Sequence, residues 1–233
     1  MGAPPAAPPA SGGPMGVPPA GGPVYGDVNG SDWDDASGRQ HPVYLRMPYG
    51  ADSSRGQALL FTLLGFVGML MMIPHFLWLF LVAIGVAVVN GLSFWIILFT
   101  GHYPRGWFEF MRKFLRYTER LNAYMQVRIN GYPSFSLSSE DEQLDLIIPY
   151  PEKHSRLWLF FSGIAAFPVM LLNGIYGIWA GILTMLGPWA VLFSGAYPQS
   201  WFEFVRKQRQ QNLRIRAFTM WLRNEYPPFG LDD

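Results

Sequence analysis

Charged residues are absent from two long stretches of the chain. No Asp, Glu, Lys or Arg occurs from Gly56 to Pro104, and none occurs from Leu157 to Gln199. The two stretches hold 49 and 43 residues, and both are rich in Leu, Ile, Val, Phe and Gly. A helix needs about 20 apolar residues to cross a bilayer core of ~30 Å. Each stretch is therefore predicted to form a helical hairpin, which gives the chain four transmembrane helices.

Prolines mark where each hairpin is expected to turn. The first tip is placed at Pro74-His75, and the second lies somewhere from Pro168 to Gly174. Pro168 could instead lie within a span as a kink, because the ascending helix of the second hairpin is shorter. The expected helices are 57–73 and 76–100 in the first hairpin, and 157–167 and 175–194 in the second.

A basic amphipathic segment follows each apolar stretch. Apolar residues recur there at helical spacing, and Arg and Lys lie mostly elsewhere on the helix. The apolar positions are Trp107, Met111, Phe114, Thr118, Leu121, Met125 and Ile129 in the first segment, and Trp201, Val205, Ile215, Phe218 and Leu222 in the second. Pro104 and Pro198 stand where a helix start tolerates a missing N–H. Both segments are expected to lie at the inner leaflet, with Arg and Lys toward anionic lipid.

One block of sequence occurs twice, 94 residues apart. Tyr-Pro-x-x-Trp-Phe-Glu-Phe-x-Arg-Lys begins at Tyr103 and again at Tyr197, and Tyr-Pro-x-Phe-x-Leu begins at Tyr132 and again at Tyr226. A shared register over so many positions indicates a tandem duplication. The predicted fold is an all-α membrane protein with small β elements. Its repeats are expected at 41–137 and 138–233, in parallel orientation, after an arm at 1–40.

The segments outside the spans are expected to be simpler. Residues 1–40 are rich in Pro, Gly and Ala and then acidic, which predicts a disordered tether. Apolar and polar residues alternate at 41–49 and 144–150, which indicates two short strands. We expect these strands to pair with the Phe-x-Leu endings of the repeats, either within a repeat or between repeats.

The basic residues set the expected orientation. Of seventeen Lys and Arg residues, three precede the first hairpin, eight lie between the hairpins, and six follow the second. The positive-inside rule then predicts a multi-pass protein of the inner (plasma) membrane with both termini in the cytoplasm. Charged residues make up only 14% of the chain, against about a quarter in ordinary globular domains.

The repeated Trp-Phe-Glu-Phe-x-Arg-Lys block and a glycine pair are the candidate functional residues. The block is either a surface that recognises a partner or lipid, or an elbow that anchors the exit of a hairpin. Glu109 and Glu203 are expected to pair with the Arg-Lys that follows on the same helix. The candidates are Trp107, Phe108, Arg112, Lys113, Trp201, Phe202, Arg206 and Lys207 of the block, with Gly177 and Gly181 as a close helix-packing face.

The sequence offers little catalytic chemistry. The four histidines show no ligand spacing, cysteine is absent, and no nucleophile elbow or phosphate-binding loop is present. The spans also lack the ionisable residues that ion and proton transporters usually carry. We therefore expect no enzymatic activity, no cofactor and no metal.

The repeated unit resembles an actinobacterial membrane family known only as a domain of unknown function. The matching motifs are those that begin at Tyr103, Tyr197, Tyr132 and Tyr226, and Ser134 departs from the Pro228 of the second copy. The size and layout are also similar to those of the lipid-uptake-coordinator type of accessory subunit of mycobacterial Mce lipid importers. The resemblance implies a non-catalytic accessory or scaffold subunit of a larger membrane complex. Its expected partners are membrane lipids and an integral-membrane protein such as a transporter permease, without nucleic acid. The alternative is a self-contained membrane-shaping or lipid-sensing hairpin protein.

Overall fold

The two uncharged stretches form long single helices. The structure is a computed structural model that describes residues 41–47, 49, 54–137, 144–151 and 153–231, so the arm predicted at 1–40 lies outside the described residues. Helix α2 spans Gly65–Thr100, with 36 residues, and α4 spans Arg156–Ser194, with 39 residues. The other elements are β1 (Tyr44–Arg46), α1 (Arg55–Phe61), α3 (Arg105–Met125), β2 (Asp145–Ile147) and α5 (Gln199–Thr219).

The predicted hairpin tips are wrong, because α2 continues through Pro74 and α4 continues through Pro168. Two long helices therefore stand where four transmembrane helices were predicted, and the alternative position of Pro168 inside a helix is confirmed. An interior proline removes one backbone hydrogen bond and disturbs the turn before it. A tyrosine hydroxyl reaches each of these turns: Tyr132 donates to the carbonyl of Met71, three residues before Pro74, at 2.9 Å. Apolar helices tolerate proline where a neighbouring segment supplies such a donor.

The chain reverses at the ends of the long helices instead. Gly101 and Gly195 follow α2 and α4 with φ of 74° and 83°, the left-handed conformation that ends many helices. Pro104 and Pro198 then cap the next helices in extended conformations, which confirms the predicted helix starts. The hairpins of this fold therefore join a long apolar helix to the basic helix that follows it.

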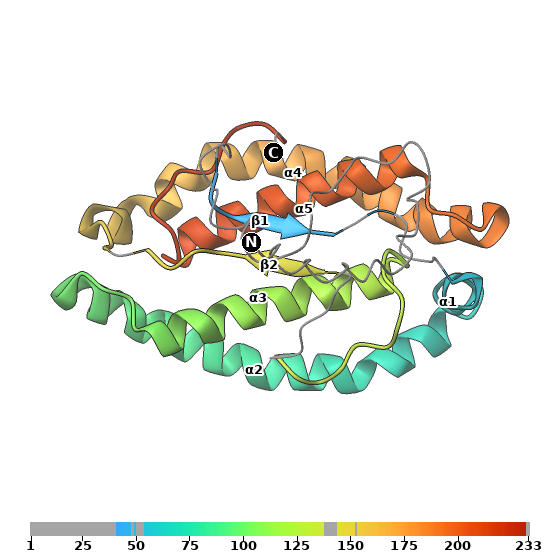
Figure 1. Ribbon diagram of the computed structural model, residues 1–233, viewed down its shortest axis with the longest axis horizontal. Coiled ribbons are helices and arrows are strands. Elements are labelled where there is room, and N and C mark those ends of the chain that lie inside the picture. Colours follow the sequence, from blue (N-terminus) through green and yellow to red (C-terminus); the bar gives the residue numbers. More distant parts are fainter. Residues whose placement is uncertain (1–40, 48, 50–53, 138–143, 152, 232–233) are drawn as a thin grey trace, which may run out of the picture. The chain divides into compact units, whose positions relative to one another are not determined.

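The first helix pair, α2 and α3, is antiparallel (Figure 1). Near the start of α3, the ring of Phe110 lies 3.4 Å from the Cβ position of Gly85. Farther along, the hydroxyl of Tyr117 lies 2.6 Å from Nδ1 of His75. The two helices therefore contact each other at Phe110 and again at Tyr117, two turns farther along α3.

The second pair, α4 and α5, is antiparallel in the same way (Figure 1). Tyr197, just before α5, donates to the carbonyl of Leu183 at 3.2 Å. At the other end, Nε1 of Trp221 donates to the hydroxyl of Ser162 at 3.1 Å. The ring of Tyr197 occupies the space that a Cβ at residue 187 would need, so Gly187 permits this contact.

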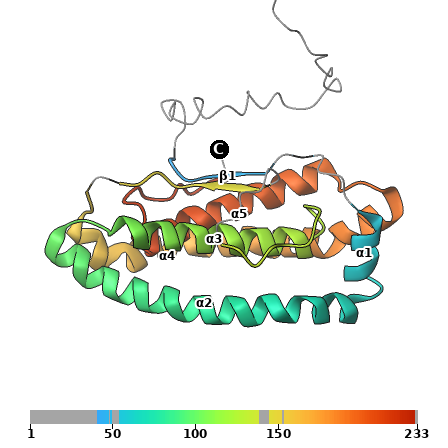
Figure 2. The same cartoon turned by 60° about the horizontal axis from the view of Figure 1, so that its bottom comes forward.

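Strands β1 and β2 pair with each other, antiparallel, with Leu45 opposite Leu146. The expected pairing with the Phe-x-Leu endings is therefore wrong. Both strands direct alternate apolar residues into the core, Leu45 and Leu146 among them, whereas Phe135 and Phe229 of those endings are exposed. The sheet lies against α3 and α5, and α2 lies on the far side of α3 from it (Figure 2).

Equivalent positions in 41–137 and 144–231 make equivalent contacts. Helices α3 and α5 both have 21 residues. The backbone N–H of Ser54 donates to Asn130, and that of Ser155 donates to Asn224, both at 3.2 Å. The donation from Tyr132 to α2 is matched by one from Tyr226 to the carbonyl of Ala165 at 2.9 Å.

Two tyrosines join one half to the other. Tyr49, from the segment after β1, donates to the carbonyl of Tyr197 at 2.7 Å, and Tyr150, after β2, donates to the carbonyl of Tyr103. Each half therefore holds the start of the other half's basic helix.

Candidate functional site

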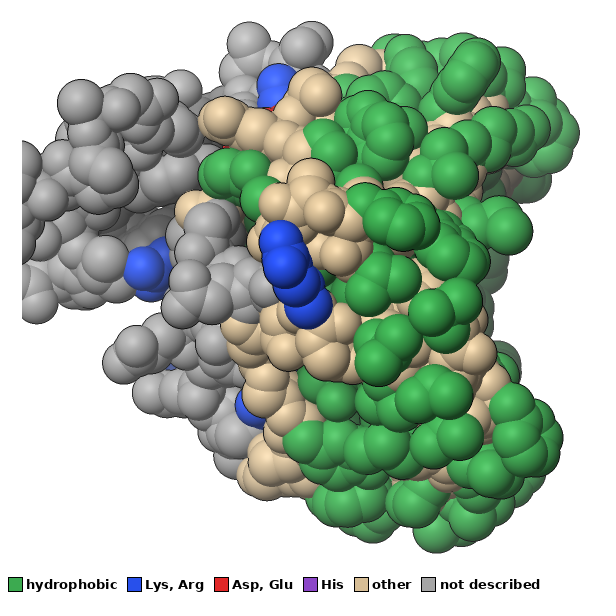
Figure 3. Space-filling model, turned by 90° about the vertical axis from the view of Figure 1, so that its right-hand side faces the viewer, with side chains coloured by type: hydrophobic (Ala, Val, Ile, Leu, Met, Phe, Trp, Pro, Cys, Tyr) green, Lys and Arg blue, Asp and Glu red, His purple; other side chains and the backbone are tan. Residues whose placement is uncertain are grey.

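The outward faces of α2 and α4 form a continuous apolar surface. Exposed large hydrophobic residues occur around most of the circumference of both helices, and only a narrow stripe of each helix is buried against the rest of the chain. On α2 they include Phe66, Ile73, Leu77, Phe80, Ile84, Val88, Trp95 and Phe99; on α4 they include Leu157, Ile164, Phe167, Leu171, Ile178, Ile182, Met185 and Phe193. Hydrophobic side chains cover the right-hand side of Figure 3, while Lys and Arg lie toward its middle and left. Surfaces of this extent mark contact with a membrane or a protein.

Both helices are long and apolar enough to cross a membrane. Only 22% of the most apolar window of α2 and 28% of that of α4 is buried within the protein. The core helix of a soluble protein would be mostly buried, so these helices are built to contact something outside the chain.

Charged residues lie along α3 and α5, the helices that pack beside α2 and α4. In α3 they recur from Arg105 in the first turn to Arg120 in the fifth, and in α5 from Glu203 to Arg216. The i, i+3 pairs predicted from the sequence are confirmed: Arg112 lies 2.7 Å from Glu109, and Arg206 lies 3.1 Å from Glu203.

The repeated aromatic block is mostly internal. Phe108 and Phe202 are buried, and each packs edge-on against a tyrosine of the other half, Tyr150 and Tyr49 respectively. Arg206 is also buried. The remaining candidates of the block are half-buried, namely Trp107, Arg112, Lys113, Trp201 and Lys207. These residues join the helix pairs to the sheet and expose only part of their surface.

The candidate glycines lie in two different environments on α4. The Cβ position of Gly177 lies 3.6 Å from Nε2 of Gln208 on α5. The Cβ position of Gly181 has no neighbour within 4 Å. Gly177 borders a pocket of about 390 Å³ between α4 and α5, and Gly181 is open to the surroundings.

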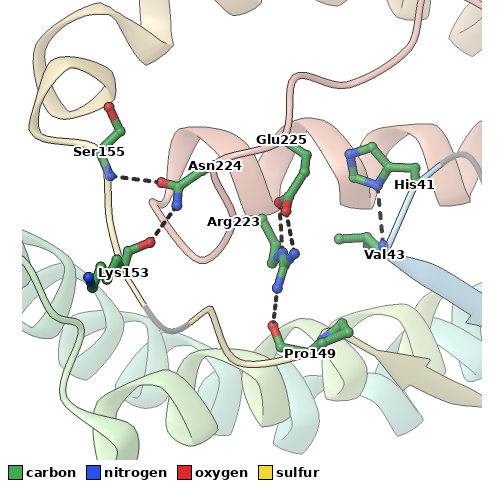
Figure 4. Close-up of polar contacts among 8 residues, drawn as sticks. All are labelled: His41, Val43, Pro149, Lys153, Ser155, Arg223, Asn224 and Glu225. Atoms are coloured by element: carbon green, nitrogen blue, oxygen red, sulfur yellow. Dashed lines mark hydrogen bonds and ion pairs between the residues drawn. The ribbon is translucent and has the colours of Figure 1, made fainter. Parts of the chain in front are cut away.

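A polar network ties the C-terminal segment to the start of α4 (Figure 4). Arg223 pairs with Glu225 and donates to the carbonyl of Pro149 at 2.8 Å. Asn224 accepts from the N–H of Ser155 and donates to the carbonyl of Lys153 at 2.7 Å. Burial would raise the pKa of Glu225, but the bond and charge of Arg223 outweigh it and lower that pKa.

His41 lies in the same region and is only 3% exposed. Its Nδ1 accepts from the backbone N–H of Val43 at 3.2 Å (Figure 4). Burial, with the nearby charge of Arg214, lowers its pKa to about 4. The imidazole is therefore neutral at physiological pH.

Two charged side chains in the core had no signal in the sequence. Glu119 is fully buried and Arg128 is 2% exposed, and both carboxylate oxygens of Glu119 lack a hydrogen-bond partner. Burial and the charge of Arg209 lower the pKa of Arg128 to about 10, although Tyr197 and Glu119 partly oppose the shift. Leucine occupies the position 94 residues later in each case, so the buried charges at these two positions have no counterpart in the second half.

Metal chemistry has no evident place in the described ranges. Within them, no group of three or more His, Cys, Asp or Glu side chains is arranged to hold an ion.

Comparison with known families covers part of the first half. Residues 66–136 match the sequence model of a family described as Domain of unknown function (DUF4389). The match runs from the start of α2, through α3, into the Tyr-Pro-x-Phe segment after it. No curated protein and no solved structure matches the chain at a significant level. The region from α2 to residue 136 is thus similar to a domain of unknown function.

Proposed function

We propose that the chain is a monotopic membrane protein that embeds α2 and α4 in the cytoplasmic leaflet. The carrying observation is that each long apolar helix lies beside a charged helix of 21 residues, which is long enough to match the thickness of a bilayer core. Helix α3 is about 31 Å long at 1.5 Å per residue, close to the thickness of a bilayer core. If α2 crossed the bilayer, α3 would carry its charges from Arg105 to Arg120 across as well. A charged side chain at the centre of a bilayer costs about 2.5–3.5 kcal/mol or more.

The length of the apolar helices supports the same arrangement. Helix α2 is about 54 Å long and α4 about 58 Å. To keep a 54 Å helix within a core of ~30 Å, the helix would need a tilt of about 56°, outside the usual 0–40° range. Helices that lie in the interface meet no such limit, and they bury an apolar face while a polar face stays wet.

The sheet also argues against crossing. Strands β1 and β2 run alongside α3 and α5 (Figure 1), so they would enter the bilayer with those helices. A two-stranded sheet leaves backbone N–H and C=O groups unpaired at both edges, which hydrocarbon does not tolerate. On a membrane surface the same edges face water.

We infer further that the halves are copies of one unit related by a pseudo-two-fold axis. The equivalent contacts of Ser54 and Ser155, and of Tyr132 and Tyr226, support this inference. So does the antiparallel register that places Leu45 opposite Leu146. An axis normal to the membrane would present both apolar helices to the same leaflet.

The proposed activity is physical: the chain shapes the membrane that it enters. At about 10 Å in width, α2 and α4 together occupy on the order of 1,000 Å² of one leaflet. Material added to one leaflet alone favours curvature. Of the two functions expected from the sequence, this geometry favours membrane shaping.

Labelling of single cysteines tests the topology, and the natural absence of cysteine makes it clean. Gly56→Cys and His102→Cys flank α2, while Lys153→Cys and Ala196→Cys flank α4. An impermeant maleimide should label none of the four in intact cells and all four after permeabilisation. Labelling of one flank of α2 from outside, with the other protected, would show that α2 spans.

A vesicle assay tests the activity. Purified chain added to large vesicles should yield smaller vesicles or tubules by electron microscopy. Unchanged vesicles with bound chain would refute membrane shaping while leaving the proposed topology intact.

The role of accessory subunit, with a lipid-transporter permease as partner, stays a prediction. Purification from native membranes would support it if a permease co-purified in stoichiometric amount, and would count against it if only copies of this chain appeared.

A further inference from the structure

The pocket between α4 and α5 has the chemistry of an amphiphile site. Its volume is about 390 Å³. Met170 and Ile215 supply apolar lining, and Asn173, Gln208 and Asn212 supply amides. A site that is apolar on one side and polar on the other suits a molecule with the same division.

Two polar groups on residues that line the pocket lack side-chain partners among the residues that the structure describes. Oδ1 of Asn212 is buried without a hydrogen-bond donor. The guanidinium of Arg216 is half-buried and forms no ion pair with the residues that the structure describes. Gln208 already donates to Asn173, at 3.4 Å. A ligand that brings a hydroxyl donor to Asn212 and an anionic oxygen to Arg216 would satisfy both groups.

The opening of the pocket faces lipid in the proposed orientation. Gly174 and Gly177 line it from α4, and the Cβ position of Gly174 has no neighbour within 4 Å. Met170, one turn earlier, is among the exposed hydrophobic residues of α4. An acyl chain that leaves the pocket here would continue along the apolar face of α4.

The corresponding place in the first half is filled. Leu79 and Phe114 stand 94 residues before Asn173 and Gln208, and both pack against the hydrophobic core. Asn122 stands in the place of Arg216. The second half therefore carries two amides where the first carries Leu79 and Phe114, and it carries a cation where the first carries a neutral amide.

We propose that this pocket binds an anionic phospholipid whose headgroup carries free hydroxyls, of which phosphatidylglycerol is the simplest. Arg216 pairs with the phosphate, Asn212 accepts from a headgroup hydroxyl, and the glycine side admits the acyl chains. The inference needs lipid to reach the pocket, but it does not require α2 and α4 to share one leaflet.

Native mass spectrometry in mild detergent tests the site with defined lipids. The wild type should retain phosphatidylglycerol at least tenfold more strongly than phosphatidylcholine. Arg216→Asn, which installs the residue of the first half, should abolish most of that preference. Gly177→Leu should prevent retention by filling the pocket. Ala83→Leu, at the position matching Gly177, is the control and should retain lipid as the wild type does.

Each remaining outcome bears on the site. Equal retention by wild type, Arg216→Asn and Gly177→Leu would place the lipid elsewhere and overturn the proposal. Displacement of phosphatidylglycerol by millimolar inorganic phosphate would indicate a free-anion site instead. Circular dichroism of each variant verifies folding, and Asn212→Thr, again a first-half residue, supplies a second loss variant if Gly177→Leu fails to fold. If phosphatidylglycerol is retained as expected but one flank of α2 is labelled from outside the cell, the monotopic arrangement is wrong and the lipid site stands.

Discussion

The tyrosine of each Tyr-Pro-x-Phe motif should stabilise the protein through the proline-containing turn of its long helix. The hydroxyl of Tyr132 lies 2.9 Å from the carbonyl of Met71, three residues before Pro74. Tyr132→Phe removes this donor and keeps the ring, which packs against Tyr124 and His75. A typical hydrogen bond contributes about 0.5–1.5 kcal/mol, and this one is exposed on the surface of the chain. We expect a loss of about 0.5–1.5 kcal/mol.

A double-mutant cycle isolates the reason for that loss. Pro74→Ala restores a backbone N–H that can donate to the carbonyl of Leu70, next to Met71, and it removes the clash of the proline ring with that turn, so the carbonyls there depend less on an outside donor. In this background Tyr132→Phe should cost about 1 kcal/mol less than in the wild type. Tyr226→Phe with Pro168→Ala should repeat the result, because Tyr226 donates to Ala165 at the same 2.9 Å.

Equilibrium unfolding in mild detergent, followed by far-ultraviolet circular dichroism, measures the four free energies of each cycle. Tyr176→Phe on α4 is the control. Its hydroxyl forms no hydrogen bond with the residues that the structure describes, so the change should alter the free energy of unfolding by less than about 0.5 kcal/mol. Equal costs of Tyr132→Phe with and without Pro74 would show that the hydroxyl does not serve the proline turn.

Three further perturbations follow from the polar core and the repeated block. Since the pKa of His41 falls from 6.5 unfolded to about 4 folded, stability should be full above pH 6.5 and decline by about 3 kcal/mol as pH falls toward 4; unfolding titrations should show a flatter profile for His41→Gln. Arg128→Leu alone should destabilise by about 3–5 kcal/mol, and Glu119→Leu added to it should recover most of that loss, unless the two charges are uncoupled. Trp107→Ala and Trp201→Ala should each cost about 2 kcal/mol in thermal unfolding, less than a fully buried tryptophan, and a silent change at one site would show that the two positions have diverged.

Local geometry determined which features could be predicted from the sequence. The pairs Glu109–Arg112 and Glu203–Arg206 depend only on helical spacing, and both form. The basic helices begin after their prolines as expected, because capping is also local. The repeated sequence block indicated where the two basic helices begin, but it did not show that the apolar segment before each one is a single helix.

The misplaced hairpin turns have a non-local cause. Pro74 looks like a helix end when only its neighbours are considered. The donor that accompanies continuous helix there belongs to Tyr132, about sixty residues away in sequence. Strand pairing failed for a similar reason, since alternation reveals a buried face but not the partner strand. The buried charges of Glu119 and Arg128 could not be inferred either, because the second half packs leucine at those positions.

A long apolar helix crosses a membrane only if the elements packed along it can cross too. Hydropathy scores α2 and α4 as spans because it evaluates each helix by itself. In the structure, α3, α5 and the sheet pack together with the long helices, so their charges and unpaired strand edges would have to enter the hydrocarbon as well. This is the reason for our proposal that the chain buries one face in the membrane and does not insert the whole unit. The decisive quantity is therefore the polarity of the neighbours of an apolar helix, which the order of residues along that helix does not contain.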